Sequence, residues 1–169
     1  MKTLLVDGYN LIYAHPELAE TMQQDQDAAR DGLLKELSPL ASPDRYELVM
    51  VVFDAAGSSQ PEPVVQERDG ITVVFTSRRQ SADAFIERVV RRLLPDNEVV
   101  VATSDRLLLN LVGGFGASTI DGRSLLGMTE EALLETREEM KKIAGRSRNS
   151  LEDRVSEEVR RLLDEMRYR

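Results

Sequence analysis

The feature that most constrains the fold is a run of six apolar residues, LVMVVF, at positions 48–53. A run this short and rich in β-branched residues is typical of a strand, and its lack of polar positions indicates that both of its faces are covered. Similar runs lie at 3–6, 71–75 and 99–102, and a weaker one lies at 117–120. The sequence therefore predicts a central sheet that is mainly parallel.

Amphipathic segments separate these predicted strands. Apolar residues recur at helical spacing in residues 28–37, in the segment that Ser81 can cap, and in a shorter segment that follows Asp105 and ends at Val112. A glycine-rich loop is expected at residues 113–116. The alternation of strands and helices predicts an α/β/α sandwich with helices on both faces of the sheet.

The remainder of the chain, from Thr129 onward, has a helical pattern and is strongly charged. Four apolar residues near its end share one narrow seam: Val155, Val159, Leu162 and Met166. This seam is expected either to dock on the body or to meet a partner. We therefore expect one domain over residues 1–128 and a C-terminal helical extension over residues 129–169.

Composition excludes several classes of protein. The absence of cysteine excludes disulfides, thiolate metal sites and cysteine nucleophiles, and an apolar fraction of 41% is too high for a disordered chain. The apolar run that ends at Asp7 is too short for a signal peptide, and no uncharged stretch approaches the ~20 residues of a membrane span. A cytoplasmic protein with no membrane partner is expected.

The charge balance bears on nucleic-acid binding. Acidic residues outnumber basic ones, 30 to 22, for a formal net charge of −8, which argues against tight non-specific binding to nucleic acid. Basic residues nevertheless gather in two segments: Arg78, Arg79, Arg88, Arg91 and Arg92 in one, and Lys141, Lys142, Arg146 and Arg148 in the other. The net charge therefore weakens but does not exclude an interaction with RNA.

Aspartates come shortly after three of the predicted strands: Asp7, Asp54 and Asp105. Asp83 lies at the start of the helix that follows the strand at 71–75. Ligands of parallel α/β sheets bind beyond the carboxyl ends of the strands, so these side chains are expected at one rim. Carboxylates gathered there repel each other unless a hard cation lies among them, and oxygen ligands suit Mg²⁺ or Mn²⁺. Zinc is not favoured, since the only histidine is His15, in a predicted loop.

The same aspartates have an alternative, purely structural interpretation. An aspartate after a strand often forms a turn or caps a helix, and the helix dipole alone favours Asp83 near a helix start. The joint placement of all four at one rim favours a metal site over four unrelated caps. The residue pattern leaves both interpretations open.

Motifs spread along the chain resemble those of one family. The opening motif DGYNLI at residues 7–12 is similar to that of NYN-domain proteins, which are PIN-like nucleases, and specifically to the YacP-type bacterial branch. The likeness extends to VFDA at 52–55, to SAD followed by FIE within 81–87, to ATSD at 102–105 and to GGFGA at 113–117. It covers nearly the whole chain.

This resemblance implies a PIN-like three-layer sandwich and an endoribonuclease that uses Mg²⁺ or Mn²⁺ and leaves 5′-phosphate and 3′-hydroxyl ends. The expected substrate is RNA. Because some relatives work in association with the ribosome, messenger RNA at the ribosome is one possible substrate. Asp7, Asp83 and Asp105 match the family's acidic metal site, and Asp54 matches a further acidic position. Asn10 matches the asparagine of the opening motif and is expected to orient a scissile phosphate or a water at the metal.

Four residues are candidates for contact with RNA: Arg78, Arg79, Arg88 and Tyr9. The arginines would hold phosphates and the tyrosine would stack on a base, whereas Tyr13 is expected to pack within the fold. The alternative for the arginines is a solvated, charged loop. Residues 78–81 read RRQS, where relatives tend to carry an acidic residue and a threonine, so the number of metal ions stays open.

Rival functions make distinct predictions. A non-catalytic RNA- or ribosome-binding module on the same fold would keep its binding when the aspartates are replaced by asparagine. Haloacid-dehalogenase phosphatases need a second aspartate two residues after the first, where this chain has Tyr9. A receiver-type module needs a lysine after a late strand, and none follows residues 99–102. The sequence predicts no oligomeric state.

Overall fold

The computed structural model describes residues 1–55, 59–142, 157 and 159–164. This part of the chain holds a six-stranded sheet with the strand order β3-β4-β2-β1-β5-β6. The strands are β1 (Lys2–Asp7), β2 (Leu48–Phe53), β3 (Val64–Arg68), β4 (Ile71–Phe75), β5 (Glu98–Ala102) and β6 (Ser118–Ile120). The helices are α1 (Gly8–Ala14), α2 (Pro16–Gln24), α3 (Gln26–Leu37), α4 (Ala82–Leu93), α5 (Arg106–Gly114) and α6 (Gly122–Lys142), and a short 3-10 helix (Ser38–Leu40) follows α3.

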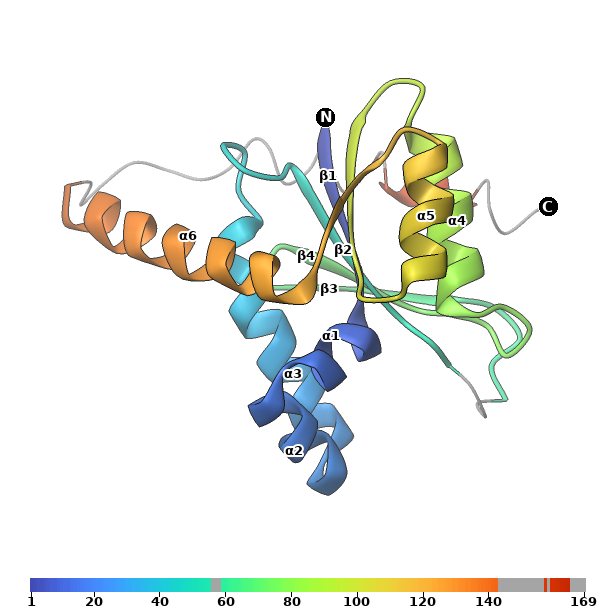
Figure 1. Cartoon of the computed structure of the whole chain (residues 1–169), viewed down its shortest axis with the longest axis horizontal. Coiled ribbons are helices and arrows are strands. Elements are labelled where there is room, and N and C mark those ends of the chain that lie inside the picture. Colours follow the sequence, from blue (N-terminus) through green and yellow to red (C-terminus); the bar gives the residue numbers. More distant parts are fainter. Residues whose placement is uncertain (56–58, 143–156, 158, 165–169) are drawn as a thin grey trace.

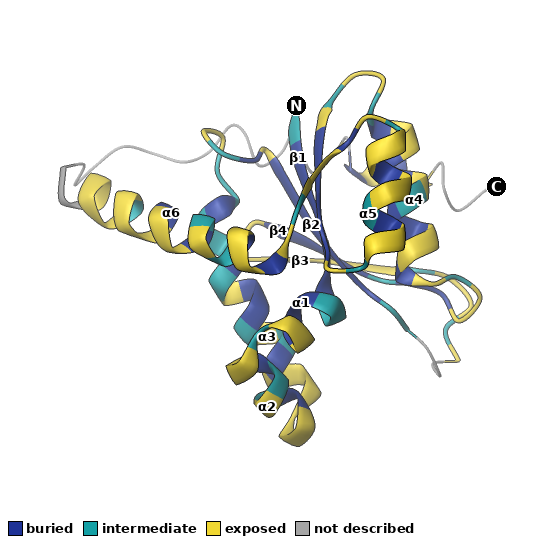
Figure 2. Cartoon of the chain, viewed as in Figure 1, coloured by how far each residue is buried: buried dark blue, intermediate teal, exposed yellow. Residues whose placement is uncertain are grey.

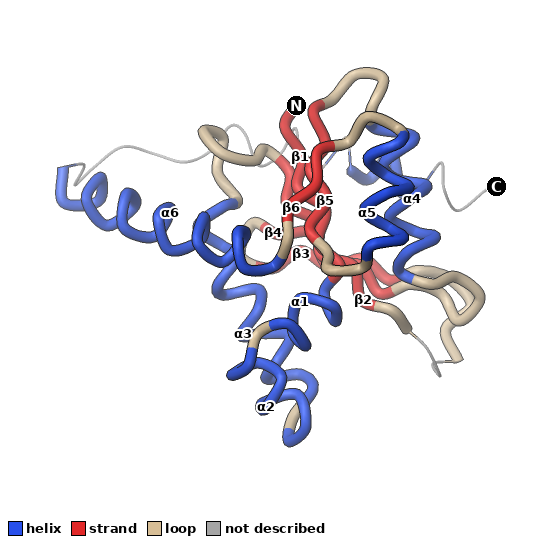
Figure 3. Tube along the Cα trace, in the orientation of Figure 1, coloured by secondary structure: helices blue, strands red, loops and turns tan. Residues whose placement is uncertain are grey.

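Every pair of neighbouring strands in the sheet is parallel except β3 and β4, which are antiparallel. β1 lies between β2 and β5 (Figure 3). β2 is buried along its whole length, as its unbroken apolar sequence predicts, whereas β3 is exposed along its whole length at the outer side of the sheet. The prediction of a mainly parallel sheet with helices on both faces is confirmed.

Two hydrophobic cores lie on opposite faces of the sheet (Figures 1 and 2). α1, α2, α3 and α6 cover one face, where Val49 and Val51 point, and α4 and α5 cover the other face against Met50 and Val52. This split follows from the alternation of side chains along a strand. The layers are therefore those of an α/β/α sandwich.

The predicted seam near the end of the chain contributes to the hydrophobic core beneath α4 and α5. Val159 and Leu162 are buried beside the residues of α4 and α5, so this part of the seam docks on the body. Val155 and Met166 lie outside the described residues. No helix in the described part of the chain is both long and apolar enough to span a bilayer.

The passage from β1 into α1 depends on a glycine. A Cβ atom at Gly8 would lie 2.4 Å from Cε1 of Phe53, so any larger residue would collide with the ring at the end of β2. Asp7, the last residue of β1, caps α1 by accepting a hydrogen bond from the backbone N–H of Asn10. The chain therefore turns sharply and brings Asp7 to the carboxyl end of the sheet.

Several details differ from the sequence prediction. α1, α2 and β3 are not predicted, and the loop predicted at 113–116 is wrong in part because α5 continues to Gly114. The boundary predicted between residues 128 and 129 falls inside α6, which begins at Gly122. The prediction that Tyr13 packs within the fold is also wrong, since 64% of this residue is exposed.

Candidate metal centre

Asp7 is the most unusual residue at the carboxyl end of the sheet. Only 9% of it is exposed, and its carboxylate accepts hydrogen bonds from the backbone N–H of Asn10 (3.4 Å) and from Oγ1 of Thr103 (3.3 Å). The pKa of Asp7 is raised to about 6, chiefly by burial and also by the nearby carboxylates of Asp83 and Asp105, while the two hydrogen bonds oppose the rise. Asp7 is therefore a buried acid beside other acids.

A hydrogen-bond network joins Asp7 to the loop between β5 and α5. The Oγ1 atom of Thr103 donates to Asp7 and also accepts from the backbone N–H of Asp105 (3.1 Å). Oδ1 of Asn10 accepts from the backbone N–H of Ser104 (2.6 Å). The network fixes the spacing between two of the predicted ligands. Thr103 was missed by sequence reasoning, although it lies inside the ATSD motif.

Asp83 lies in the first turn of α4, on the same side of the sheet as Asp7. The residue is exposed at the surface, but partial burial of its carboxyl group, together with the carboxylates of Asp105 and Asp54, raises its pKa above the usual value. A like charge nearby disfavours the ionised form of an acid, so the raised pKa shows that Asp83 is close enough to Asp105 and Asp54 to be repelled by them. Ser81 caps α4 by accepting from the backbone N–H of Ala84 (3.2 Å), as predicted.

Asp54 and Asp105 also support helix starts. Oδ2 of Asp54 accepts from the backbone N–H of Ala82 (3.2 Å) at the beginning of α4. Oδ1 of Asp105 accepts from Leu107 (2.8 Å) and Leu108 (3.4 Å) at the beginning of α5. The capping interpretation is therefore correct for these oxygens. It does not account for the electrostatic influence of Asp83 and Asp105 on Asp7.

The donor set fits a hard cation in its chemistry. In the described part of the chain, Asp7, Asp83 and Asp105 form no ion pair with a lysine or arginine, so protein cations do not neutralise them. The same part contains no three acidic or histidine side chains already close enough to form a ready metal-binding group. The side chains would therefore have to draw together around an ion.

Gln80 precedes α4, the helix that carries Asp83. Its amide Nε2 is buried without a hydrogen-bond partner among the described residues.

The predicted RNA-binding arginines lie in or just before α4, and they differ in whether their side chains already have partners. Arg78 and Arg79 are exposed in the turn before α4, and Arg88 is exposed on α4. Arg91 is already engaged, because it pairs with Glu87 (2.9 Å) and its guanidinium lies 4.2 Å from the centre of the Phe115 ring. Arg78, Arg79 and Arg88 are therefore exposed close to the start of α4, where the predicted role requires them.

Tyr9, predicted to stack on a base, is half-buried and already makes two side-chain contacts. Its ring packs against Phe53 with a centroid distance of 5.0 Å, and its hydroxyl accepts from Nε of Arg30 (3.0 Å). Arg30 comes from α3 and was not among the predicted site residues. No sequence signal could have identified it, since its partners are distant in the chain.

The sheet order and the helices on both faces, with aspartates at or shortly after the carboxyl ends of β1, β2 and β5, are those of a nuclease-like fold of the PIN-like class. A family model described as the YacP-like NYN domain matches residues 4–168. The chain belongs to this family, as its motifs predict.

Similar proteins agree with this assignment. Over 131 residues the chain is 34% identical to a protein of Bacillus subtilis (strain 168) described as "Uncharacterized protein YacP", and the match covers 77% of this chain and 76% of that protein. A crystal structure of a tryptophan-to-leucine mutant of Rae1 (YacP) from Bacillus subtilis superposes with a TM-score of 0.68 at 30% identity, covering 91% of this chain and 90% of that one. A second Rae1 (YacP) crystal structure gives a TM-score of 0.63 at 30% identity, with coverage of 99% and 95%.

Proposed function

We propose that this protein is an endoribonuclease that depends on a divalent metal ion and hydrolyses RNA to products with 5′-phosphate and 3′-hydroxyl ends. The observation that carries the proposal is Asp7, a buried carboxylate with a pKa of about 6 in the field of Asp83 and Asp105. Burying an acid beside other acids costs stability, so such an arrangement is typical of a functional site. The nuclease-like family supports the same conclusion.

Asp7, Asp83 and Asp105 would hold Mg²⁺ or Mn²⁺, with Asp54 as an additional ligand or an outer anchor. Carboxylate oxygens are the ligands that both ions accept, and the chain offers no cysteine and only one histidine as alternatives. When bound, such an ion supplies Lewis acidity and positive charge at the scissile phosphodiester.

Other residues position the acids and the substrate. Thr103 orients the Asp7 carboxylate and links it to the backbone of Asp105. Asn10 holds the backbone of Ser104, so it keeps the start of α1 against the loop before α5. We assign the remaining amide group of Asn10 to the phosphate or to water.

The substrate is RNA, held through its phosphates by Arg78, Arg79 and Arg88. These exposed cations offset the chain's net negative charge locally, near the start of α4. A messenger RNA presented by the ribosome is the setting that the family resemblance implies, and the protein is expected to act in the cytoplasm. The test below therefore compares translated with free RNA.

The test uses end-labelled RNA with Mg²⁺, Mn²⁺ or EDTA, and compares the wild type with Asp7→Asn. We expect cleavage by the wild type with either metal, loss of cleavage in EDTA, and a loss of at least about 100-fold in Asp7→Asn. Chemical analysis of the new ends should find 5′-phosphates. Asp44→Asn, at an exposed aspartate in the turn before β2 and therefore at the opposite end of that strand from Asp54, is the matched control and should cut normally.

Equal cutting by Asp7→Asn and the wild type, or undiminished cutting in EDTA, would exclude this mechanism. RNA or ribosome binding that survives Asp7→Asn, with no cleavage by the wild type under any condition, would instead favour the non-catalytic binding module. This alternative has a structural basis, since Asp54 and Asp105 already serve as helix caps.

A further inference from the structure

A cavity of about 200 Å³ lies between α3 and the strands β2, β4 and β3. Its floor is apolar: Leu34, Phe53, Val73 and Phe75. Its rim is polar: Asp27, Arg30, Asp31, Gln66 and Arg68. The cavity is smaller than the ~300–1,000 Å³ of pockets that enclose whole drug-sized ligands, so it suits a single ring system.

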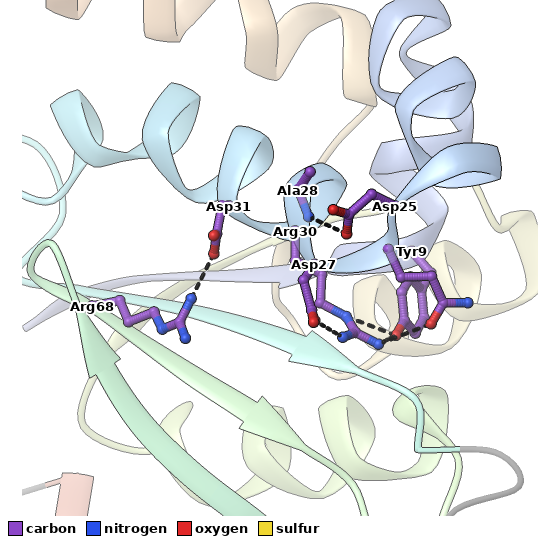
Figure 4. Close-up of polar contacts among 8 residues, drawn as sticks. Tyr9, Asp25, Asp27, Ala28, Arg30, Asp31 and Arg68 are labelled. Atoms are coloured by element: carbon purple, nitrogen blue, oxygen red, sulfur yellow. Dashed lines mark hydrogen bonds and ion pairs between the residues drawn. The ribbon is translucent and has the colours of Figure 1, made fainter.

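The charges of the rim disfavour an anionic ligand. Nη1 of Arg30 lies 2.6 Å from a carboxylate oxygen of Asp27, and Nη1 of Arg68 lies 2.5 Å from one of Asp31. Figure 4 shows both pairs, with Arg68 reaching from β3 toward Asp31 on α3. Each arginine is therefore neutralised by its own aspartate, and a phosphate would have to displace a carboxylate. A neutral ligand would not have to displace either carboxylate.

The floor and one wall are planar. The rings of Phe53 and Phe75 stack with a centroid distance of 5.5 Å and an angle of 23°. The guanidinium of Arg30 lies 5.3 Å from the centre of the Phe75 ring and 5.8 Å from that of Phe53. Flat aromatic and guanidinium surfaces are the groups on which nucleobases stack.

One side chain on the rim is available to contact the edge of a ring. Gln66 is exposed on β3, and its amide, which carries both a donor and an acceptor, forms no hydrogen bond within the described part of the chain. In the strand register it faces Val73 of β4, on the α3 side of the sheet. An amide of this kind pairs with the donor and acceptor edge of a base.

Residues that line the cavity lie next to residues of the proposed metal centre in the chain. Phe53 immediately precedes Asp54, and Arg30 donates to the hydroxyl of Tyr9, two residues after Asp7 (Figure 4). Phe53 itself is fully buried, so the ring of the half-buried Phe75 is the one that a nucleoside next to a phosphate at the aspartates would reach.

We propose that this cavity is a nucleobase-binding subsite, in which one base of the RNA stacks on Arg30 and Phe75 and presents its edge to Gln66. This inference rests on the proposed nuclease function for its biological meaning, but the binding it describes does not need the metal. It gives the enzyme a preference for the base at one position near the cleaved bond.

The direct test measures binding of the four ribonucleosides to the full-length protein in EDTA by amide chemical-shift perturbation, with ribose 5-phosphate and inorganic phosphate as comparison ligands. We expect saturable shifts in α3, β3 and β4 with at least one nucleoside, and none there with the two phosphates. Arg30→Lys keeps the charge and removes the planar group, and Gln66→Ala removes the amide. Each should weaken nucleoside binding about tenfold.

Val65→Ala is the matched control, because Val65 is an exposed neighbour of Gln66 on β3 whose side chain faces the opposite side of the sheet. It should bind nucleosides as the wild type does. Thermal unfolding of each variant identifies any loss that comes from unfolding. Absence of shifts at millimolar nucleoside, equal shifts with ribose 5-phosphate, or unchanged binding by both folded variants would overturn the subsite.

A cleavage assay with Mg²⁺ separates this inference from the proposed function. If the wild type cuts RNA with a base preference that Arg30→Lys and Gln66→Ala reduce but Val65→Ala retains, both are supported. Cleavage with the same preference in all variants would overturn the subsite and leave the nuclease intact. Nucleoside binding without any cleavage would leave the subsite and overturn the nuclease.

Discussion

Replacing Asp7 with asparagine should stabilise the folded protein while it removes the activity. The pKa of Asp7 rises from 3.8 to about 6 on folding, so the folded state binds this proton more tightly than the unfolded chain does. Ionisation of Asp7 therefore opposes folding, and the penalty develops as the pH rises from about 4 to about 6. Below that range the carboxyl is neutral in both states and the penalty is absent.

The size of the effect follows from the shift. At about 1.4 kcal/mol for each pKa unit, the ionised carboxylate costs the folded state about 3 kcal/mol at neutral pH. An asparagine can keep both hydrogen bonds, because its oxygen can accept from the N–H of Asn10 and its amide can donate to Thr103. Allowing for less favourable hydrogen bonds, we expect a gain of about 1–3 kcal/mol in the free energy of unfolding. For a chain of this size, Tm should rise by roughly 3–10 °C.

The assay is urea unfolding followed by circular dichroism, in EDTA, at about pH 8 and about pH 4. Asp7→Asn should exceed the wild type at the higher pH and equal it at the lower pH. Asp44→Asn, at an exposed position, should stay within about 0.5 kcal/mol of the wild type at both. A variant that is less stable than the wild type at about pH 8, or a gain that persists at about pH 4, would refute the reasoning.

Three further predictions concern the same region. Mg²⁺ should raise the Tm of the wild type in a thermal-shift assay but not that of Asp7→Asn, because only the carboxylate form binds the ion; equal shifts would count against the metal site. Gly8→Ala should destabilise the fold by about 2 kcal/mol or more in urea unfolding, since its Cβ would collide with Phe53, whereas Gly127→Ala meets nothing within 4 Å and should be neutral or stabilising. Thr103→Val should cost about 1–2 kcal/mol and raise the pKa of Asp7 in an NMR titration, because Asp7 loses a hydrogen bond that favours its charged form; an unchanged pKa would contradict the network.

The sequence predicts the interior of the sheet better than its periphery. β2 and β4 are recognisable because burial on both faces demands apolar runs, unbroken in β2 and interrupted only by Thr72 in β4. β3 is exposed on both faces, so burial imposes no periodicity on its sequence VVQER. α1 and α2 are short. In addition, α1 begins with Gly8, which has a low helix propensity but is needed there because only a glycine fits against the ring of Phe53.

The positions of the acids at the site are predictable, whereas their partners are not. Asp7, Asp54 and Asp105 stand out because they come at or just after the carboxyl ends of apolar runs. The roles of Thr103 and Arg30 depend on contacts with side chains far away in sequence, such as the contact between Arg30 and Tyr9. Local pattern carries no information about such contacts, so the cavity beside α3 becomes visible only in the folded chain.

The two outer strands of the sheet each present backbone N–H and C=O groups along which a second chain could add. β6 has only three residues, which is too short for a stable new ladder. β3 is longer, but it ends in Glu67 and Arg68 and follows Pro63, and charge and proline are the features that discourage strand addition. Both edges of the sheet therefore carry features that protect the folded protein against the growth of fibres from its exposed strands.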